Sequence, residues 1–209
     1  MIEIWKKSEL ARLRETYGFA FSKELGQNFL ADRNVAEKIA DACAGGGVDV
    51  IEIGAGAGAL TVHLAARARK VFAVELDARV IPLLAAVCEG LENVVILHED
   101  FLKIEPDRLS ERYVLAGNLP YQITTHVITT VMEGLHGGFA GAACSRPPEG
   151  RPPLQAMVFM VQKEVADRLL AARPERLDLI RDLPSSVRLT EAAQSRLTLT
   201  NPTARTARL

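Results

Sequence analysis

The chain has 209 residues, of which 48% are hydrophobic and 24% are charged, with a formal net charge of −1. This length allows one sizeable core, and the near-neutral charge argues mildly against a nucleic-acid binder, although local charge can still serve that purpose. No apolar run reaches membrane-spanning length, and the charged N-terminus is unlike a secretory signal, so we expect a cytoplasmic protein. Cys43, Cys88 and Cys144 form no CxxC pair and are expected to be structural thiols; no metal site is predicted.

The first 30 residues form a unit of their own. Residues 1–16 carry a helical pattern, with Ile4, Leu10 and Leu13 on one side and many charges on the other. Residues 17–30, YGFAFSKELGQNFL, are punctuated by glycine and rich in phenylalanine. We treat 1–30 as an N-terminal helix with a following segment.

Residues 31–172 alternate between strand and helix patterns. Asp32 can cap a first helix, and Gly45-Gly46-Gly47 can end it. Such alternation predicts an α/β, Rossmann-like domain with a parallel sheet, helices on both faces and ligands at the carboxyl ends of the strands. The expected strands are 48–53, 70–75, 93–97, 112–117 and 155–161, and the expected helices are 58–68, 78–89, 122–133 and 162–172, with a long loop at 134–153.

The alternation stops after Ala172. Residues 173–209 hold many arginine, serine and threonine residues and only scattered apolar ones, with no clear strand pattern. We therefore expect a poorly ordered tail.

The stretch VIEIGAGAGALT, residues 50–61, joins a strand to a helix through three alternating glycines. Glycine there lets the backbone turn tightly and approach a ligand closely. Glu75 ends the next strand, 17 residues after Gly58, at the distance where a carboxylate can accept hydrogen bonds from ribose hydroxyls. A solvated strand end is the plainer reading of Glu75.

The residues of the loop limit the classes of ligand that it could bind. It has no lysine, so a P-loop is excluded, and acidic Glu52 would repel a pyrophosphate but can hold a cationic amino acid group. This favours S-adenosylmethionine, with Glu75 on the ribose and Asp100 near the adenine amine. Capping roles remain open for Glu52, at the following turn, and for Asp100, at a helix start.

Asn118-Leu119-Pro120-Tyr121, at the end of strand 112–117, suits methylation of an amine conjugated to an aromatic ring. Hydrogen bonds from that amine to the Asn118 side chain and the Leu119 carbonyl would localise its lone pair. Pro120 holds the turn rigidly and Tyr121 can stack on the base. A tight turn with a packed tyrosine is the plainer alternative. A base would have to leave its stack to reach this site.

Six ordered segments together resemble the ribosomal RNA adenine N6,N6-dimethyltransferases, most closely those acting on two adjacent adenosines near the 3′ end of small-subunit rRNA. These segments are YGFAFSKELGQNFL (17–30), VIEIGAGAGALT (50–61), VFAVELD (71–77), EDFL (99–102), GNLPYQITT (117–125) and MVFMVQKEVADRLL (157–170). The resemblance implies a class I S-adenosylmethionine-dependent methyltransferase with rRNA of the small subunit or its precursor as partner, without a membrane.

The resemblance also implies roles for individual residues. Residues 1–30 would contact cofactor and RNA. The implied catalytic residues are Asn118, Leu119, Pro120 and Tyr121, and the implied cofactor-binding residues are Gln27, Asn28, Leu30, Glu52, Gly54, Gly56, Glu75, Leu76, Asp100, Phe101 and Asn118. Phe29 is a less secure candidate for the wall of the target site.

The chain departs from the family pattern after Ala172. The family continues into two more strands and a small helical C-terminal domain, and neither is recognisable in residues 173–209. A truncation or reading-frame change would explain this. We then expect strand 155–161 to be an exposed apolar edge that invites self-association, weak stability and impaired activity.

Three other functions remain open. One is the related large-subunit, macrolide-resistance type of methyltransferase; another is a methyltransferase of DNA adenine or a small amine. A third is a ribosome-assembly factor without catalysis. Candidate phosphate contacts are Lys6, Lys7, Arg12, Arg14 and Lys23, each equally readable as part of a solvated helix face.

Overall fold

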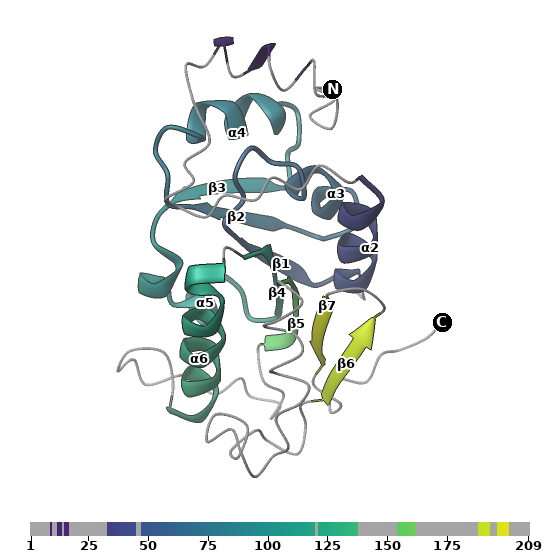
Figure 1. Cartoon of the computed structure of the whole chain (residues 1–209), viewed down its shortest axis with the longest axis vertical. Helices are drawn as coiled ribbons and strands as arrows, with labels where there is room; N and C mark the ends of the chain where they lie inside the picture. The colour runs from purple at the N-terminus through teal and green to yellow at the C-terminus, as the bar shows by residue number, and fades with distance from the viewer. Residues whose placement is uncertain are drawn as a thin grey trace.

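A computed structural model describes residues 9, 12–13, 15–16, 33–44, 47–119, 121–137, 154–161, 188–192 and 196–200 (Figure 1). The strands are β1 (Asp49–Ile53), β2 (Val71–Glu75), β3 (Val94–His98), β4 (Tyr113–Asn118), β5 (Leu154–Met160), β6 (Arg188–Ala192) and β7 (Arg196–Thr200). The helices are α2 (Arg33–Cys43), α3 (Thr61–Ala65), α4 (Ile81–Val87), α5 (Pro106–Leu109) and α6 (Tyr121–Gly137), with a 3-10 turn η1 (Phe101–Lys103). None of the helices in this part is long and apolar enough to cross a membrane.

The strands form one sheet in the order β3-β2-β1-β4-β5-β7-β6. Strands β1 to β5 pair in parallel, as predicted, whereas β7 runs antiparallel to both β5 and β6. The chain order reverses beside β1, with β2 on one side and β4 on the other. In open α/β sheets, ligands bind outside the carboxyl ends of the strands next to such a reversal.

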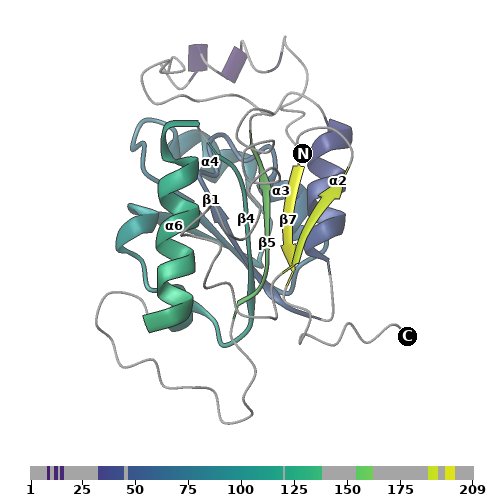
Figure 2. The same cartoon turned by 60° about the horizontal axis from the view of Figure 1, so that its bottom comes forward.

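Helices cover both faces of this sheet, with α2 and α6 on opposite sides (Figure 2). Successive strand side chains point to opposite faces, so each face has its own core. Val50 and Val114 pack in one core with residues of α2, α3 and α4, and Ile51 and Leu115 pack in the other with residues of α6. The continuous burial of β1, β2 and most of β4 is what a parallel sheet covered on both faces requires.

The prediction that no strand follows Ala172 is wrong. Strands β6 and β7 form an antiparallel pair, and β7 pairs with β5 from Ala156↔Thr200 to Met160↔Arg196. The β7 sequence, RLTLT, alternates leucine with polar residues, a period-2 pattern short enough to be overlooked in an arginine-rich segment. The prediction that β5 forms an exposed edge is therefore also wrong. That exposed edge was the reason for expecting self-association and weak stability, so this reason no longer holds.

Several boundaries differ from the predicted ones. Helix α3 is shorter than predicted, because the glycine loop continues to Leu60, and α6 extends to Gly137, into the segment predicted as loop. The short elements η1 and α5, between β3 and β4, were not predicted. The predicted helix at 162–172 lies outside the described residues.

Cys43 and Cys88 are buried free thiols, as predicted, and burial raises the pKa of each to about 12. They are therefore protonated packing residues at neutral pH. Cys144 lies outside the described residues.

Candidate functional site

Strand register brings the predicted site residues to one edge of the sheet. Glu75 pairs with His98 between β2 and β3, and Asn118 pairs with Met160 between β4 and β5. Between them, Ile53 of β1 pairs with Val74 and leads directly into the glycine loop. The loop, Glu75, the Asp100 segment and Asn118 thus follow the carboxyl ends of four adjacent parallel strands, as the sequence predicted.

The glycine loop owes its shape to backbone conformations that glycine favours. Gly54 and Gly56 have φ values of 71° and 55°, and no atom lies within 4 Å of the place where a Cβ would be. The N–H groups of Gly54 and Ala55 both donate to the Val74 carbonyl, at 2.9 and 3.0 Å. The loop is therefore folded tightly against β2 and leaves open space above these two glycines.

Gly58 has a different role, because it packs against α4. Its φ is 87°, and an added Cβ would lie 3.0 Å from Val87 Cγ1 and 3.1 Å from Leu84 Cδ1. The third glycine therefore permits close contact between the loop and a helix.

We predict that Gly58→Ala lowers the free energy of unfolding by about 2–3 kcal/mol, since it combines a left-handed backbone with overpacking. Gly90→Ala is the matched control, because Gly90 has a φ of 83° with no atom within 4 Å of an added Cβ. It should cost only the backbone part, about 1 kcal/mol. Urea unfolding of both variants measures the difference; equal losses would contradict the packing role of Gly58.

Glu75 connects the glycine loop to the end of β2. Its Oε2 accepts a hydrogen bond from the Gly56 N–H at 2.7 Å, and its Oε1 accepts one from the Asp77 N–H at 2.8 Å. The residue is only 7% exposed. Glu75 is therefore not a solvated strand end. Each carboxylate oxygen still has a lone pair beyond the one used, so ribose hydroxyls could be accepted as well.

Glu52 lies in β1, two residues before the glycine loop, and is 1% exposed. The Thr61 hydroxyl, at the start of α3, donates to Glu52 Oε2 at 2.6 Å. Burial raises the pKa of Glu52 to about 8; the Thr61 hydrogen bond opposes this rise and the nearby Glu75 carboxylate adds to it. This bond joins two side chains and caps no described backbone N–H, so it does not match the capping alternative for Glu52, and contact with a ligand stays a prediction.

The segment after β3 contributes Asp100 and Phe101. Asp100 is partly buried, and its Oδ1 accepts a hydrogen bond from the Leu102 N–H at 3.0 Å, which caps η1. The Phe101 side chain is 5% exposed and belongs to the core on the α6 face, so only its backbone could reach a ligand. Leu76, directly after Glu75, is 60% exposed and offers apolar surface at this edge.

The predicted catalytic motif follows β4. Asn118 ends the strand half-buried, and the Leu119 N–H donates to the Met160 carbonyl at 3.2 Å, while α6 begins at Tyr121. Gly117, which the sequence argument did not single out, lets the motif approach β1, because an added Cβ would lie 2.6 Å from the Ile53 carbonyl oxygen.

Some predicted residues lie outside the described part or lack described side chains. Pro120 and the N-terminal candidates Gln27, Asn28, Phe29 and Leu30 are outside it, as are Lys6, Lys7, Arg14 and Lys23, and for Tyr121 only the backbone is described. Arg12 is exposed and forms an ion pair with Glu9 at 2.7 Å. Across the described ranges no cluster of three or more His, Cys, Asp or Glu residues could hold a metal.

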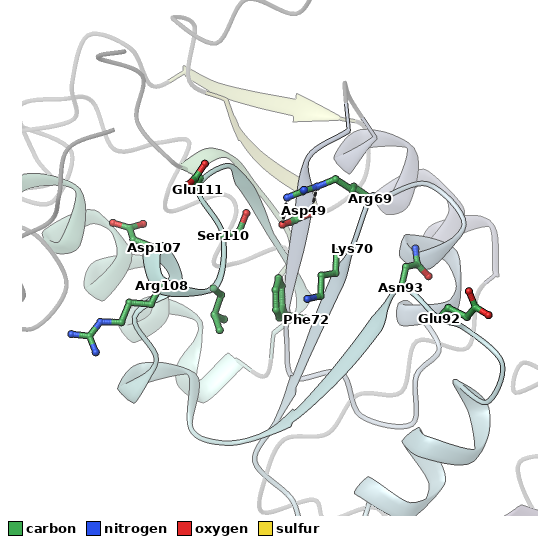
Figure 3. A pocket seen from close by; sticks show the side chains of 11 residues that line it. Asp49, Arg69, Lys70, Phe72, Glu92, Asn93, Asp107, Arg108, Ser110 and Glu111 are labelled. Atoms are coloured by element: carbon green, nitrogen blue, oxygen red, sulfur yellow. Dashed lines mark hydrogen bonds and ion pairs between the residues drawn. The ribbon is translucent and has the colours of Figure 1, made fainter. Parts of the chain in front are cut away.

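A cavity of about 740 Å³ lies at the opposite, amino edge of the sheet (Figure 3). Arg69 donates to both carboxylate oxygens of Asp49, at 2.8 and 2.7 Å, and Lys70 Nζ lies 4.7 Å from the centre of the Phe72 ring. The lining of the cavity carries charges of both signs. The basic residues are Arg69, Lys70 and Arg108, and the acidic residues are Asp49, Glu92, Asp107 and Glu111. The cavity favours no single class of ligand and is remote from the predicted site.

The comparisons with known proteins point to the same family. The family model for ribosomal RNA adenine dimethylase matches residues 18–202. Ribosomal RNA small subunit methyltransferase A of Geobacillus thermodenitrificans is 44% identical over 171 residues, covering 78% of this chain and 52% of that protein. The protein of the same name from Ligilactobacillus salivarius is 40% identical over 177 residues, covering 81% and 54%. The chain thus spans about half the length of these relatives.

Two solved structures share the fold. The 23S rRNA methyltransferase ErmE has a TM-score of 0.62 at 23% identity, covering 83% of this chain and 70% of that one. A dimethyladenosine transferase from Plasmodium falciparum has a TM-score of 0.60 at 24% identity, covering 81% and 62%. The sheet is thus that of the class I methyltransferases.

The family match also corrects the interpretation of the C-terminal part. It continues past Ala172 to residue 202 and includes both β6 and β7. We therefore have no reason to interpret residues 173–202 as unrelated sequence or as the result of a changed reading frame. The chain belongs to the ribosomal RNA adenine dimethylase family.

Proposed function

We propose that this chain binds S-adenosylmethionine at the carboxyl edge of its sheet and transfers methyl groups to N6 of two adjacent adenosines near the 3′ end of small-subunit rRNA. The observation that supports the proposal is the strand order and register, in which β1 and its glycine loop lie between β2, which ends at Glu75, and β4, which ends at Asn118. The names of the relatives favour small-subunit rRNA, free or in the subunit precursor, as partner. The cytoplasm is the compartment in which such a precursor would be met.

The cofactor fits the described residues at three places. The backbone at Gly54 and Gly56 is open to close approach by the methionine part. Glu75 can accept from the ribose hydroxyls through its remaining lone pairs, and exposed Leu76 can lie against the adenine ring. The other proposed contacts are Asp100 for the adenine amine, the Phe101 backbone, Asn118, and the N-terminal residues Gln27, Asn28 and Leu30.

The proposed catalysis depends on orientation rather than on a strong base. The cofactor supplies a methyl group on a sulfonium. Asn118 Oδ1 and the Leu119 carbonyl accept hydrogen bonds from the adenine N6–H groups and so localise the nitrogen lone pair. With the cofactor bound, that pair would form the C–N bond as the C–S bond breaks, and the N6 proton would then leave to solvent. Pro120 fixes the turn, and Tyr121 stacks on the extruded base.

The proposal is tested with immature small ribosomal subunits and isotope-labelled S-adenosylmethionine. We expect labelled N6,N6-dimethyladenosine in small-subunit rRNA, detected by nucleoside mass spectrometry, and none in large subunits treated in parallel. Labelling of large subunits alone would instead support the macrolide-resistance type. Cofactor binding without methylation of either subunit would favour a ribosome-assembly factor.

A further inference from the structure

Glu52 is a buried carboxyl group in the strand that leads into the glycine loop, and it forms no ion pair with any described residue. Glu52 has the same strand periodicity as Val50, and so points to the face covered by α2, α3 and α4. It is 1% exposed, and Thr61, which bonds to it at 2.6 Å, is 0% exposed. Burying a carboxylate is costly unless a positive charge or several hydrogen bonds compensate it.

In the described part of the chain, the groups around Glu52 supply no such positive charge. Cys43 of α2 and Cys88, which follows α4, are near enough for the Glu52 charge to raise their own pKa values, and both stay neutral thiols. The remaining charged neighbour is Glu75, a second carboxylate, whose repulsion raises the pKa of Glu52. Among the described residues, no arginine, lysine or histidine forms an ion pair with Glu52.

We propose that Glu52, held by Thr61, is a specificity-determining residue that distinguishes positively charged S-adenosylmethionine from its neutral product, S-adenosylhomocysteine. This inference rests on the proposed function. Glu52 lies two residues before Gly54, in the strand that leads into the loop that Glu75 ties down through Gly56. The sulfonium bound on that loop would supply the missing positive charge. Glu52 acts through its electric field and makes no contact with the reacting atoms.

Proton linkage gives the proposal its mechanism. Burial raises the pKa of Glu52 to about 8, so at pH 7 the group is mostly protonated without a cation nearby. A bound sulfonium favours the carboxylate, and Glu52 releases its proton as the cofactor binds. Methyl transfer turns the sulfonium into a thioether and removes that charge. Glu52 then takes up a proton again, and the product is held less tightly than the cofactor.

The sign of the pH effect follows from the raised pKa. Between the ordinary value of 4.5 and about 8, the folded protein binds a proton that the unfolded chain has lost. Stability without cofactor should therefore fall as pH rises through this range. The affinity for the cofactor should instead rise with pH, because at high pH Glu52 has already lost its proton before the cofactor binds.

The experiment is calorimetric titration of the full chain with S-adenosylmethionine and, separately, S-adenosylhomocysteine, from pH 6.5 to 8.5. Relative to S-adenosylhomocysteine, the affinity for S-adenosylmethionine should rise roughly tenfold over this range. Both ligands carry the same amino and carboxyl groups, so their ratio isolates the sulfonium. Buffers of different ionisation enthalpy should report a larger release of protons at pH 7 for S-adenosylmethionine than for S-adenosylhomocysteine.

Three variants separate this role from a structural one. Glu52→Gln should remove the pH dependence of the ratio and the proton release. Thr61→Val should shift the profile to higher pH, since it removes the hydrogen bond that lowers the Glu52 pKa, and Thr61→Ser should restore it. Asp49→Asn is the matched control: this carboxylate is 2% exposed on the same strand, but pairs with Arg69 at the opposite edge.

The outcomes are distinct. A pH-dependent ratio that disappears in Glu52→Gln and survives in Asp49→Asn supports the proposal. An identical pH dependence in the wild type and Glu52→Gln overturns it and leaves the proposed function intact. If Glu52→Gln does not fold, an unshifted profile in Thr61→Val overturns it equally. Failure of the wild type to bind S-adenosylmethionine at any pH overturns both the proposed function and this inference.

Discussion

Glu75→Gln should weaken binding of S-adenosylmethionine by about 100-fold, equivalent to nearly 3 kcal/mol. Both carboxylate oxygens accept from backbone N–H groups, at 2.7 Å from Gly56 and 2.8 Å from Asp77. An amide must turn its NH₂ group toward one of these donors, which leaves a buried N–H without an acceptor. The variant therefore loses a proposed ribose acceptor and loosens the glycine loop at once. Calorimetry measures the binding loss.

Glu99→Gln is the matched control for this prediction. Glu99 is exposed at the same edge, and its backbone N–H donates to the Glu75 carbonyl at 3.1 Å, but its side chain has no proposed contact with the cofactor. It removes the same charge and should bind the cofactor within about twofold of the wild type. Similar losses in both variants would mean that general charge at this edge, rather than Glu75 itself, supports binding.

The position of the candidate site in the fold could be predicted because its signals are local. Alternating glycines between a strand and a helix, and polar residues ending parallel strands, are visible within short stretches of sequence. Parallel pairing then brings Gly54, Glu75 and Asn118 to one edge whatever the details of packing. Each of these residues either ends a strand or follows one directly, so strand prediction alone locates them at that edge.

The environment of each site residue could not be predicted in the same way. Glu52 is enclosed by Cys43 and Thr61 from α2 and α3 and by Cys88 after α4, and its burial depends on how these distant segments pack. Similarly, the need for glycine at position 117 arises only from the close approach of β4 to the Ile53 carbonyl. Contacts between segments far apart in sequence leave no periodic signal in either segment.

The C-terminal strands illustrate the same limit for the fold. RLTEA in β6 and RLTLT in β7 are five residues each, too short for their alternation to stand out among arginines and threonines. The pairing of β7 with β5 depends on the hydrophobic strand LQAMVFM, which lies more than thirty residues earlier. The parallel strands were easier to predict, because strands rich in apolar residues such as DVIEI and VFAVE separate clearly from the helices between them.

Asn118→Ala should lower kcat for rRNA methylation by about 10²–10³-fold, because it removes one of two proposed acceptors for the adenine N6–H groups. The other acceptor, the Leu119 carbonyl, is part of the backbone and remains, with its N–H still donating to Met160 at 3.2 Å. Cofactor affinity should fall only severalfold, since the glycine loop and Glu75 are unchanged. Single-turnover methylation of immature small subunits, with calorimetry in parallel, separates the two effects.

Asn118→Asp and Asn93→Ala complete the test. The first keeps an acceptor oxygen at the same place and should recover much of the rate lost in Asn118→Ala. The second removes an amide whose nitrogen donates to the Ala65 and Ala68 carbonyls at 2.8 and 3.2 Å, far from the proposed site. It should lower stability without changing kcat. If Asn118→Ala lowers kcat no more than Asn93→Ala does, the side chain of Asn118 is only part of a turn, and the nitrogen must be activated by another group.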